Sequence, residues 1–253
     1  MPFTTAHIAA ILPLSKYSPR LFSTSSLVIG SMVPDFEYFI RMTLYGHYGH
    51  TIRGIFIFDI PVGLLIYIIF HEIVRTPTII HLPNYFYRRL SDVSHFDWHT
   101  HFLKDFLKIV CSIFIGVLTH FVWDGFTHDE EYFFAKYAPV LLRNFTVLGH
   151  SVPLHAILQI LSTFVGMIIL FWYIHLLPSK NSKQPKSDKK IINFWGLVLA
   201  LSVLIGCIRW TIGMPDEKII GQLIVVCVSS LLLSLIIISF ISTKKSNLIT
   251  KYL

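Results

Sequence analysis

Long apolar runs separated by short polar segments make up most of the chain. Five of these runs hold about 20 residues or more, the length a helix needs to cross the ~30 Å hydrocarbon core of a bilayer. They cover residues 52–70, 106–123, 152–177, 191–213 and 219–241. The pattern predicts an all-α, polytopic helical membrane protein with about five transmembrane helices.

Two further apolar runs, 3–14 and 21–33, precede the first predicted span. Each is too short to cross a bilayer, so each is predicted to form an amphipathic helix or one that enters the membrane to half its depth. Pro34 should end the second of them, because proline cannot continue the helical hydrogen-bonding pattern. The predicted fold therefore has five spans and two short N-terminal helices.

A lysine-rich segment at 178–190, PSKNSKQPKSDKK, has the composition of a solvated linker. It divides the chain into three predicted regions. Residues 1–177 form a helical membrane domain that holds all thirteen histidines, and residues 191–253 form a two-helix membrane hairpin with a basic tail. Any histidine chemistry is therefore expected within residues 1–177.

The composition excludes an ordinary soluble domain. Only 14% of the residues are charged and the mean hydropathy is +0.64, whereas soluble domains carry about 25% charged residues. The net charge of +7 is explained by basic loops beside membrane spans, so no nucleic-acid partner is predicted. The three cysteines lie inside apolar runs and lack the spacing of a metal site.

Basic residues near the span ends predict the orientation in the membrane. The linker at 178–190 and the C-terminal tail are rich in lysine and should stay in the cytoplasm. The loop at 71–105 falls on the same side. Residues 124–150 are poor in basic residues and fall on the outer side. We therefore expect an integral membrane protein with a cytoplasmic C-terminus.

This orientation brings imidazole and carboxylate side chains from separate stretches of sequence to the outer face. Together these ligand types suit zinc and, less specifically, manganese or iron. Their number is compatible with more than one ion. The candidates are Asp35, Glu37, His47, His50, His120, Asp124, His128 and His150, joined by His7 if the first short helix starts at the outer surface.

Three of these residues share a spacing of four in THFVWDGFTH, namely His120, Asp124 and His128. On a helix, successive members of such a set lie on one face about 6 Å apart and can share a cation. A zinc ion with an open position makes bound water acidic enough to attack phosphate or acyl esters. The alternative is a group of polar residues at a helix end that holds no ligand.

Several spaced motifs together resemble a known family. They are TTAHIAAILPL, LVIGSMVPDFEYF, GHT followed by FDIP, HFVWDGFTH and VPLHAILQILST, in that order within residues 1–177. The set is similar to the bacterial integral-membrane family named domain of unknown function 4184. More distantly, it resembles membrane-bound metal-dependent hydrolases and the all-α fold of zinc-dependent phospholipase C and P1 nuclease.

That resemblance implies a bacterial plasma-membrane protein with a cluster of up to three zinc ions. A clear HxxxE pair, which the phospholipase pattern uses for another zinc, does not follow the HxxxDxxxH motif. Carried over by motif position, the implied ligands are His7, Asp35, His50, His120, Asp124 and His128.

Two further carboxylates are candidates for catalysis. Glu37 is a candidate base that would accept a proton from water. Asp59 lies roughly 10 Å into the first predicted span, where a charge is costly unless it is paired or hydrated. The alternative for Asp59 is structural, because Pro61 follows two positions later and leaves the helix backbone locally unpaired.

The main functional hypothesis is a membrane-embedded metal-dependent hydrolase acting on a phosphoester or lipid-linked substrate at the outer membrane face. The residues leave open whether the protein is an enzyme. One alternative is a membrane protein that binds or transports a metal ion or protons. Another is a protein whose polar residues only fix helix packing. Membrane lipid is the expected partner in every case.

Overall fold

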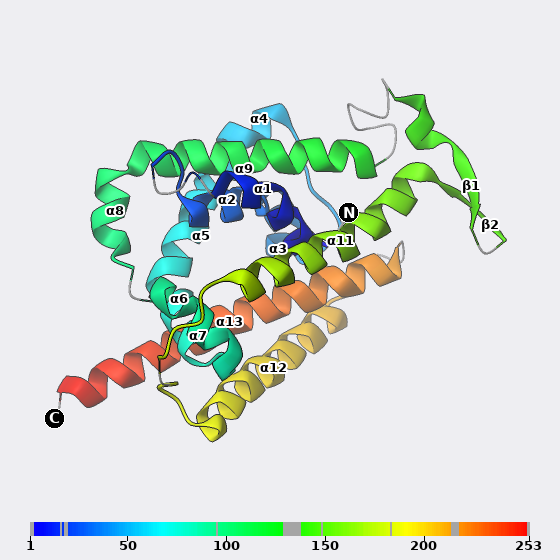
Figure 1. Ribbon diagram of the computed structural model, residues 1–253. Coiled ribbons are helices and arrows are strands. Elements are labelled where there is room, and N and C mark those ends of the chain that lie inside the picture. Colours follow the sequence, from blue (N-terminus) through cyan, green and yellow to red (C-terminus); the bar gives the residue numbers. More distant parts are fainter. Residues whose placement is uncertain are drawn as a thin grey trace. The chain divides into compact units, whose positions relative to one another are not determined.

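The structure, a computed structural model, consists mainly of helices (Figure 1). It describes residues 3–15, 17, 20–94, 96–128, 138–147, 149–182, 184–213 and 218–251, with side chains up to residue 244. Within these ranges five helices are long and apolar enough to cross a membrane, namely Ile52–Ile80, Phe106–Thr127, Leu154–Leu176, Asp188–Thr211 and Ile219–Lys244. The predicted class of helical membrane protein is confirmed.

The chain folds into two compact units that alternate along the sequence. The first comprises Met1–Asp35, Tyr48–Leu64 and Lys104–Leu176. The second comprises Phe36–His47, Leu65–Leu103 and Leu177–Leu253. Along the sequence, only the linker beyond Leu177 stands out by its composition. The other boundaries between the two units cannot be recognised in this way, because segments of the two units alternate along the chain.

Short helices open the first unit. A 3-10 turn, η1 (Thr4–His7), runs directly into α1 (Ile8–Ser15). The helix α2 (Thr24–Gly30) follows Ser23, whose side chain caps it by accepting a backbone N–H from the first turn. A second 3-10 turn, η2 (Val33–Asp35), then presents the aspartate of the predicted site.

The helix α9 (Phe106–Thr127) packs against α2 with the two backbones almost in contact. A Cβ atom on Gly30 would lie against the carbonyl group of Ile113, and one on Gly116 would lie against the carbonyl oxygen of Leu27. Only glycine leaves room for this approach. The contact fixes the position of α9, which carries two of the predicted ligands.

The helix α11 (Leu154–Leu176) contacts η1, α1 and α9 within the same unit. A small antiparallel hairpin of β1 (Asn144–Val147) and β2 (His150–Pro153) precedes it, after the 3-10 turn η5 (Pro139–Leu142). The sequence did not predict this hairpin. Its strands are largely exposed and lack a buried face, and the signal for its turn is Gly149 with φ of +83°.

The first span continues further than predicted. Its successive segments are α4 (Ile52–Gly54), a π-helical turn η3 (Ile55–Asp59), α5 (Ile60–Ile69), a π-helical turn η4 (Phe70–Val74) and α6 (Arg75–Ile80). The polarity of His71 and Arg75 suggested a loop. Both side chains are buried. Nη1 of Arg75 donates a hydrogen bond to the backbone carbonyl of Phe96 and lies 3.1 Å from Nδ1 of His71, so these polar atoms have partners inside the protein.

The second unit holds the remaining helices, α3 (Phe36–Arg41), α7 (Asn84–Ser94), α8 (Trp98–Lys104), α12 (Asp188–Thr211) and α13 (Ile219–Lys251). Helices therefore replace most of the loop expected at 71–105. The helices α12 and α13 pack against each other. Ser230 and Ser234 of α13 are buried, and small side chains of this kind allow membrane helices to approach closely.

Candidate metal centre

Two histidines and two aspartates from separate segments of the first unit meet at one point. Nε2 of His50 lies 3.4 Å from Oδ1 of Asp35 and 3.5 Å from Oδ2 of Asp124. Nε2 of His120 lies 3.6 Å from Oδ1 of Asp35 and 3.2 Å from Oδ2 of Asp124. The spacing of four along α9 therefore does place His120 and Asp124 on one helix face, turned toward the other two residues.

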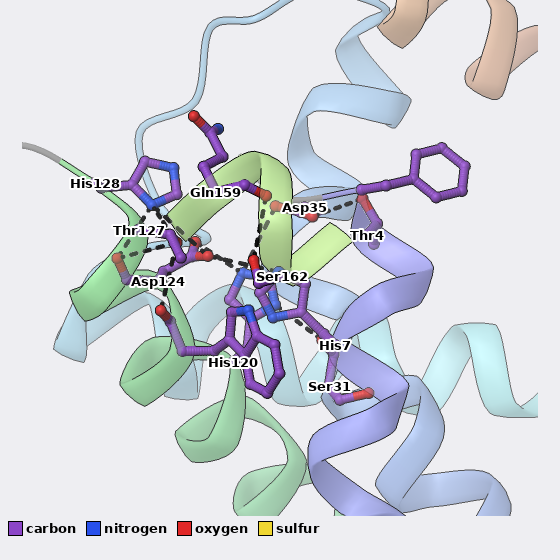
Figure 2. A network of polar contacts seen from close by, with 12 residues as sticks. Thr4, His7, Ser31, Asp35, His120, Asp124, Thr127, His128, Gln159 and Ser162 are labelled. Carbon is purple, nitrogen blue, oxygen red and sulfur yellow. Dashed lines mark hydrogen bonds and ion pairs between the residues drawn. The ribbon is translucent and has the colours of Figure 1, made fainter. Parts of the chain in front are cut away.

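A third histidine completes the cluster. Nε2 of His7 lies 3.5 Å from Oδ1 of Asp124, and its ring stacks on that of His120 with centroids 4.0 Å apart (Figure 2). Two groups of donor atoms each lie within 4.8 Å of one another. They are His7 with Asp35 and His120, and His50 with His120 and Asp124. We call these five residues the donor cluster.

The distances in the donor cluster match the requirements of a metal ion. Two ligands of one tetrahedral zinc ion, each roughly 2.1 Å from the metal, lie about 3.4 Å from each other. The four nitrogen–oxygen distances that His50 and His120 make with the two aspartates span 3.2 to 3.6 Å. The donor types and their separations therefore fit a bound cation.

Several donor atoms are buried and have no hydrogen bond within the described part of the chain. They are both ring nitrogens of His7, Oδ1 of Asp35 and both carboxylate oxygens of Asp124. Burying ionised carboxylates is costly unless a positive charge compensates them. Protonated imidazoles or a metal ion can supply that charge, and the donor set accommodates either.

Hydrogen bonds outside the cluster orient two of its members. Nδ1 of His120 lies 2.8 Å from the backbone carbonyl oxygen of Ser31, so Nδ1 carries the proton and Nε2 faces the cluster (Figure 2). The hydroxyl of Thr4 donates to Oδ2 of Asp35 over 2.6 Å. This bond leaves Oδ1 of Asp35 directed at the histidines. No functional signal in the sequence pointed to Thr4 or to the carbonyl of Ser31.

The pKa values of the cluster residues outside the spans follow from burial and from one another. Burial, aided by the neighbouring His120, lowers the pKa of His7 to about 3, so this imidazole is neutral. Burial opposes protonation of His50 as well, but the neighbouring carboxylates of Asp124 and Asp35 raise its pKa to about 9. Burial would raise the pKa of Asp35, yet His120 and His50 lower it. The first unit thus holds a neutral imidazole, His7, and a cationic one, His50, beside the ionised carboxylate of Asp35.

His128 lies at the edge of the cluster rather than inside it. It follows the last residue of α9 and is half-buried, with Nδ1 3.7 Å from Oδ1 of Asp124 and 3.1 Å from the backbone oxygen of that residue (Figure 2). Burial lowers the pKa of its imidazole. It belongs to neither of the two donor groups, although the sequence placed it among the ligands.

Glu37, the candidate base, belongs to the second unit. Its carboxylate is buried, and Oε1 accepts hydrogen bonds from Nε of Arg41 at 3.0 Å and from the backbone N–H of His47 at 2.8 Å. These bonds connect the helix α3 to the segment that follows it. A structural contribution is therefore evident for Glu37, and its action as a base stays a prediction.

Asp59, the other catalytic candidate, is fully buried in the first unit. It ends the π-helical turn η3, two positions before Pro61. Proline supplies no backbone N–H, and prolines and π-helical turns are both places where helices bend. Asp59 is not a member of either donor group among the described residues. The local geometry fits the structural alternative, and a catalytic role for Asp59 stays a prediction.

Comparison with known proteins identifies a family for this chain. A family model with the description "Domain of unknown function (DUF4184)" matches residues 1–240 of the 253-residue chain. No curated protein and no solved structure matches the chain. The resemblance found in the spaced motifs is therefore confirmed at the level of this family, and the more distant resemblance to metal-dependent hydrolases stays a prediction.

Proposed function

The chain belongs to the DUF4184 family, and we propose from its donor cluster that it is an integral-membrane, metal-dependent hydrolase. The observation that carries the proposal is the convergence of three histidines and two aspartates, each with a donor atom within 3.5 Å of another member. Zinc is the metal that this mixture of imidazole and carboxylate suits best, with manganese and iron as alternatives.

The five residues of the donor cluster would hold the metal. When bound, zinc supplies a Lewis acid and lowers the pKa of coordinated water, which is the chemistry that ester hydrolysis requires. Asp35 and Asp124 contribute the negative charge that balances the cation. Ser31 and Thr4 fix the directions of His120 and Asp35 through hydrogen bonds, as outer partners do in metal sites.

The substrate of such a centre is a phosphoester or a lipid-linked molecule. The cluster lies in a unit whose helices α9 and α11 are apolar enough to span the membrane, so a membrane-soluble substrate can approach this unit from the bilayer. We further propose that the site faces the outer surface of a bacterial plasma membrane, with the C-terminus in the cytoplasm, as the distribution of basic loops predicts.

Metal content and hydrolysis, measured on the same preparation, test the proposal. Full-length protein purified in detergent should contain at least one zinc per chain by elemental analysis and should hydrolyse bis(p-nitrophenyl) phosphate. Asp124→Asn should lose metal and activity together. Asp105→Asn, the same change at the N-terminal end of α9, should keep both. Metal without hydrolysis would leave a metal-binding protein, and no metal in the wild type would refute the proposal.

A further inference from the structure

An apolar groove of about 600 Å³ lies beside the donor cluster in the first unit. Its walls are formed by α9 and α11, and Ala10 of α1 contributes to its lining. The size lies in the range of about 300–1,000 Å³ that is usual for small-molecule sites. The groove is lined chiefly by large apolar side chains, among them Leu118, Val122, Phe126, Leu161 and Val165.

The groove is open to the bilayer. Both helices that wall it are apolar enough to span the membrane, and Val122 and Leu161 are more than half exposed. Water does not fill an apolar space of this kind, because it would find no hydrogen-bond partners there. Hydrocarbon from the surrounding lipid is the occupant that matches the lining in polarity.

The length of the groove fits one lipid chain. Its wall on α9 runs from Ile115 to Thr127, which corresponds to about 18 Å at 1.5 Å per residue. One leaflet contributes roughly half of the ~30 Å hydrocarbon core. A single chain from one leaflet can therefore lie along most of the groove.

One end of the groove meets the donor cluster. Trp123 lines the groove, and its ring centroid is 6.1 Å from that of His7. Thr127 also lines the groove, and its hydroxyl lies 3.5 Å from the backbone oxygen of Asp124, a member of the donor cluster. Nε1 of Trp123 is buried and makes no hydrogen bond with any described residue. An indole N–H in this position can donate to an ester oxygen at the end of a lipid chain.

We propose that the groove binds one hydrocarbon chain of a membrane phospholipid and presents its phosphoester to the donor cluster at the end formed by Trp123 and Thr127. The inference rests on the proposed function and gives it a substrate class, a lipid phosphoester. Hydrolysis adds one water across the P–O bond: the water oxygen bonds to phosphorus, and the departing lipid alcohol takes up a proton. The anionic phosphate suits a cationic centre and the indole N–H donor.

Photocrosslinking tests where the chain lies. Full-length protein is reconstituted in vesicles of phosphatidylglycerol that carries a diazirine either at the end of one acyl chain or next to its ester. The chain-end probe should label peptide segments around Leu118 and Val165, and the ester-proximal probe should label those around Phe126 and Leu158. The reverse order, or labelling spread evenly over all lipid-facing helices, would overturn the proposed placement.

A matched pair of variants tests the groove itself. Leu161→Trp fills the groove and should reduce labelling at least fivefold, with Val122→Trp as a second variant of the same kind. Ile160→Trp is the control. The side chain of Ile160 is next to Leu161 in the sequence, but it is 62% exposed and does not line the groove. Equal labelling in Leu161→Trp and Ile160→Trp would overturn the proposal.

Kinetics separate this inference from the proposed function. With zinc-loaded protein, Leu161→Trp should raise KM for a long-chain fluorogenic phospholipid at least fivefold more than it raises KM for bis(p-nitrophenyl) phosphate. Equal effects on both substrates would overturn the groove as a substrate site. If the wild type hydrolyses neither probe, the proposed function and the substrate class fail together, while the labelling pattern still decides whether the groove holds a lipid chain.

Discussion

The hydroxyl of Thr4 donates a 2.6 Å hydrogen bond to Oδ2 of Asp35 and thereby joins the start of the chain to the turn after α2. Both groups are buried. The bond occupies one oxygen of the carboxylate and leaves the other directed at His50 and His120. Thr4 therefore positions a ligand without being one, and this role can be tested separately from the ligands.

Thr4→Val removes the hydroxyl and keeps the shape of the side chain. We expect zinc affinity to fall about 10- to 100-fold, the range seen when an outer partner of a metal ligand is lost. Competition with a chromogenic chelator measures the change. Thr5→Val is the control, because the hydroxyl of Thr5 contacts Sδ of Met167 instead. Equal losses in the two variants would assign the effect to packing of the N-terminal turn.

His120 and His128 should differ in their importance for the metal. His120 belongs to both donor groups, so His120→Ala should abolish stoichiometric zinc in the purified protein. His128 lies outside both groups, and His128→Ala should weaken zinc binding less than tenfold. Elemental analysis and isothermal titration measure the two effects. A larger loss in His128→Ala would place this histidine among the ligands, as the sequence motif suggested.

The stability of metal-stripped protein should depend on pH through His50. Its pKa is raised to about 9 in the folded state from 6.5, so its stabilising protonation is complete below about pH 6.5 and is lost as the pH rises through 9. The charged form is stabilised by Asp35 and Asp124. The lowered pKa of His7 has the opposite effect, but only below about pH 6.5.

Thermal unfolding in detergent with EDTA measures this dependence. The melting temperature should fall by about 2 °C or more between pH 7 and pH 9. His50→Gln should flatten this part of the curve, and His150→Gln, a change on the exposed strand β2, should reproduce the wild-type slope. A wild-type melting temperature that is constant over this range would exclude a charged His50 in the metal-free cluster.

Gly116→Ala should destabilise the first unit and disturb the cluster. The added methyl group would collide with the backbone of α2, and forced overpacking of this kind costs about 1–3 kcal/mol. The melting temperature and the zinc content should both fall. Gly196→Ala on α12 is the control, because nothing lies within 4 Å of the added Cβ. Equal melting temperatures and equal zinc contents in the two variants would show that the close contact between α2 and α9 is not needed for stability or for the donor cluster.

Reporter fusions test the orientation. A reporter inserted in 178–190 should be cytoplasmic, and one inserted in 129–143 should be external, because basic loops are retained in the cytoplasm. Residues 129–137 lie outside the described part of the chain, so this test rests on the sequence alone. The reverse pattern would place the donor cluster on the cytoplasmic side and change the pool of available substrates.

The membrane spans could be predicted because their signal is local. The length and apolar composition of each run are enough to indicate a membrane span. The helix period likewise places His120 and Asp124 on one helix face without any information from other segments. The same reasoning failed at His71 and Arg75. Their polarity indicated a loop, but hydrogen bonding within the second unit allows the helix to continue to Ile80.

The partners of the ligands could not be predicted, because they are long-range or belong to the backbone. The acceptor for His120 is a carbonyl oxygen of Ser31, a group that every residue carries. The partner of Asp35 is a threonine 31 positions away in the sequence. Glu37 shows the converse, since its closeness to Asp35 in sequence suggested a shared site and the fold assigns the two to different units.

The wide spread of the donor cluster along the chain sets the order in which the protein can mature. His7 emerges from the ribosome first, and Asp124 becomes available only after nearly all of α9 has been synthesised. A nascent chain that has not reached Asp124 holds at most four of the five donors. The complete set of donors therefore exists only after the first two spans have been synthesised, so the full metal site cannot form before about half of the chain has been made.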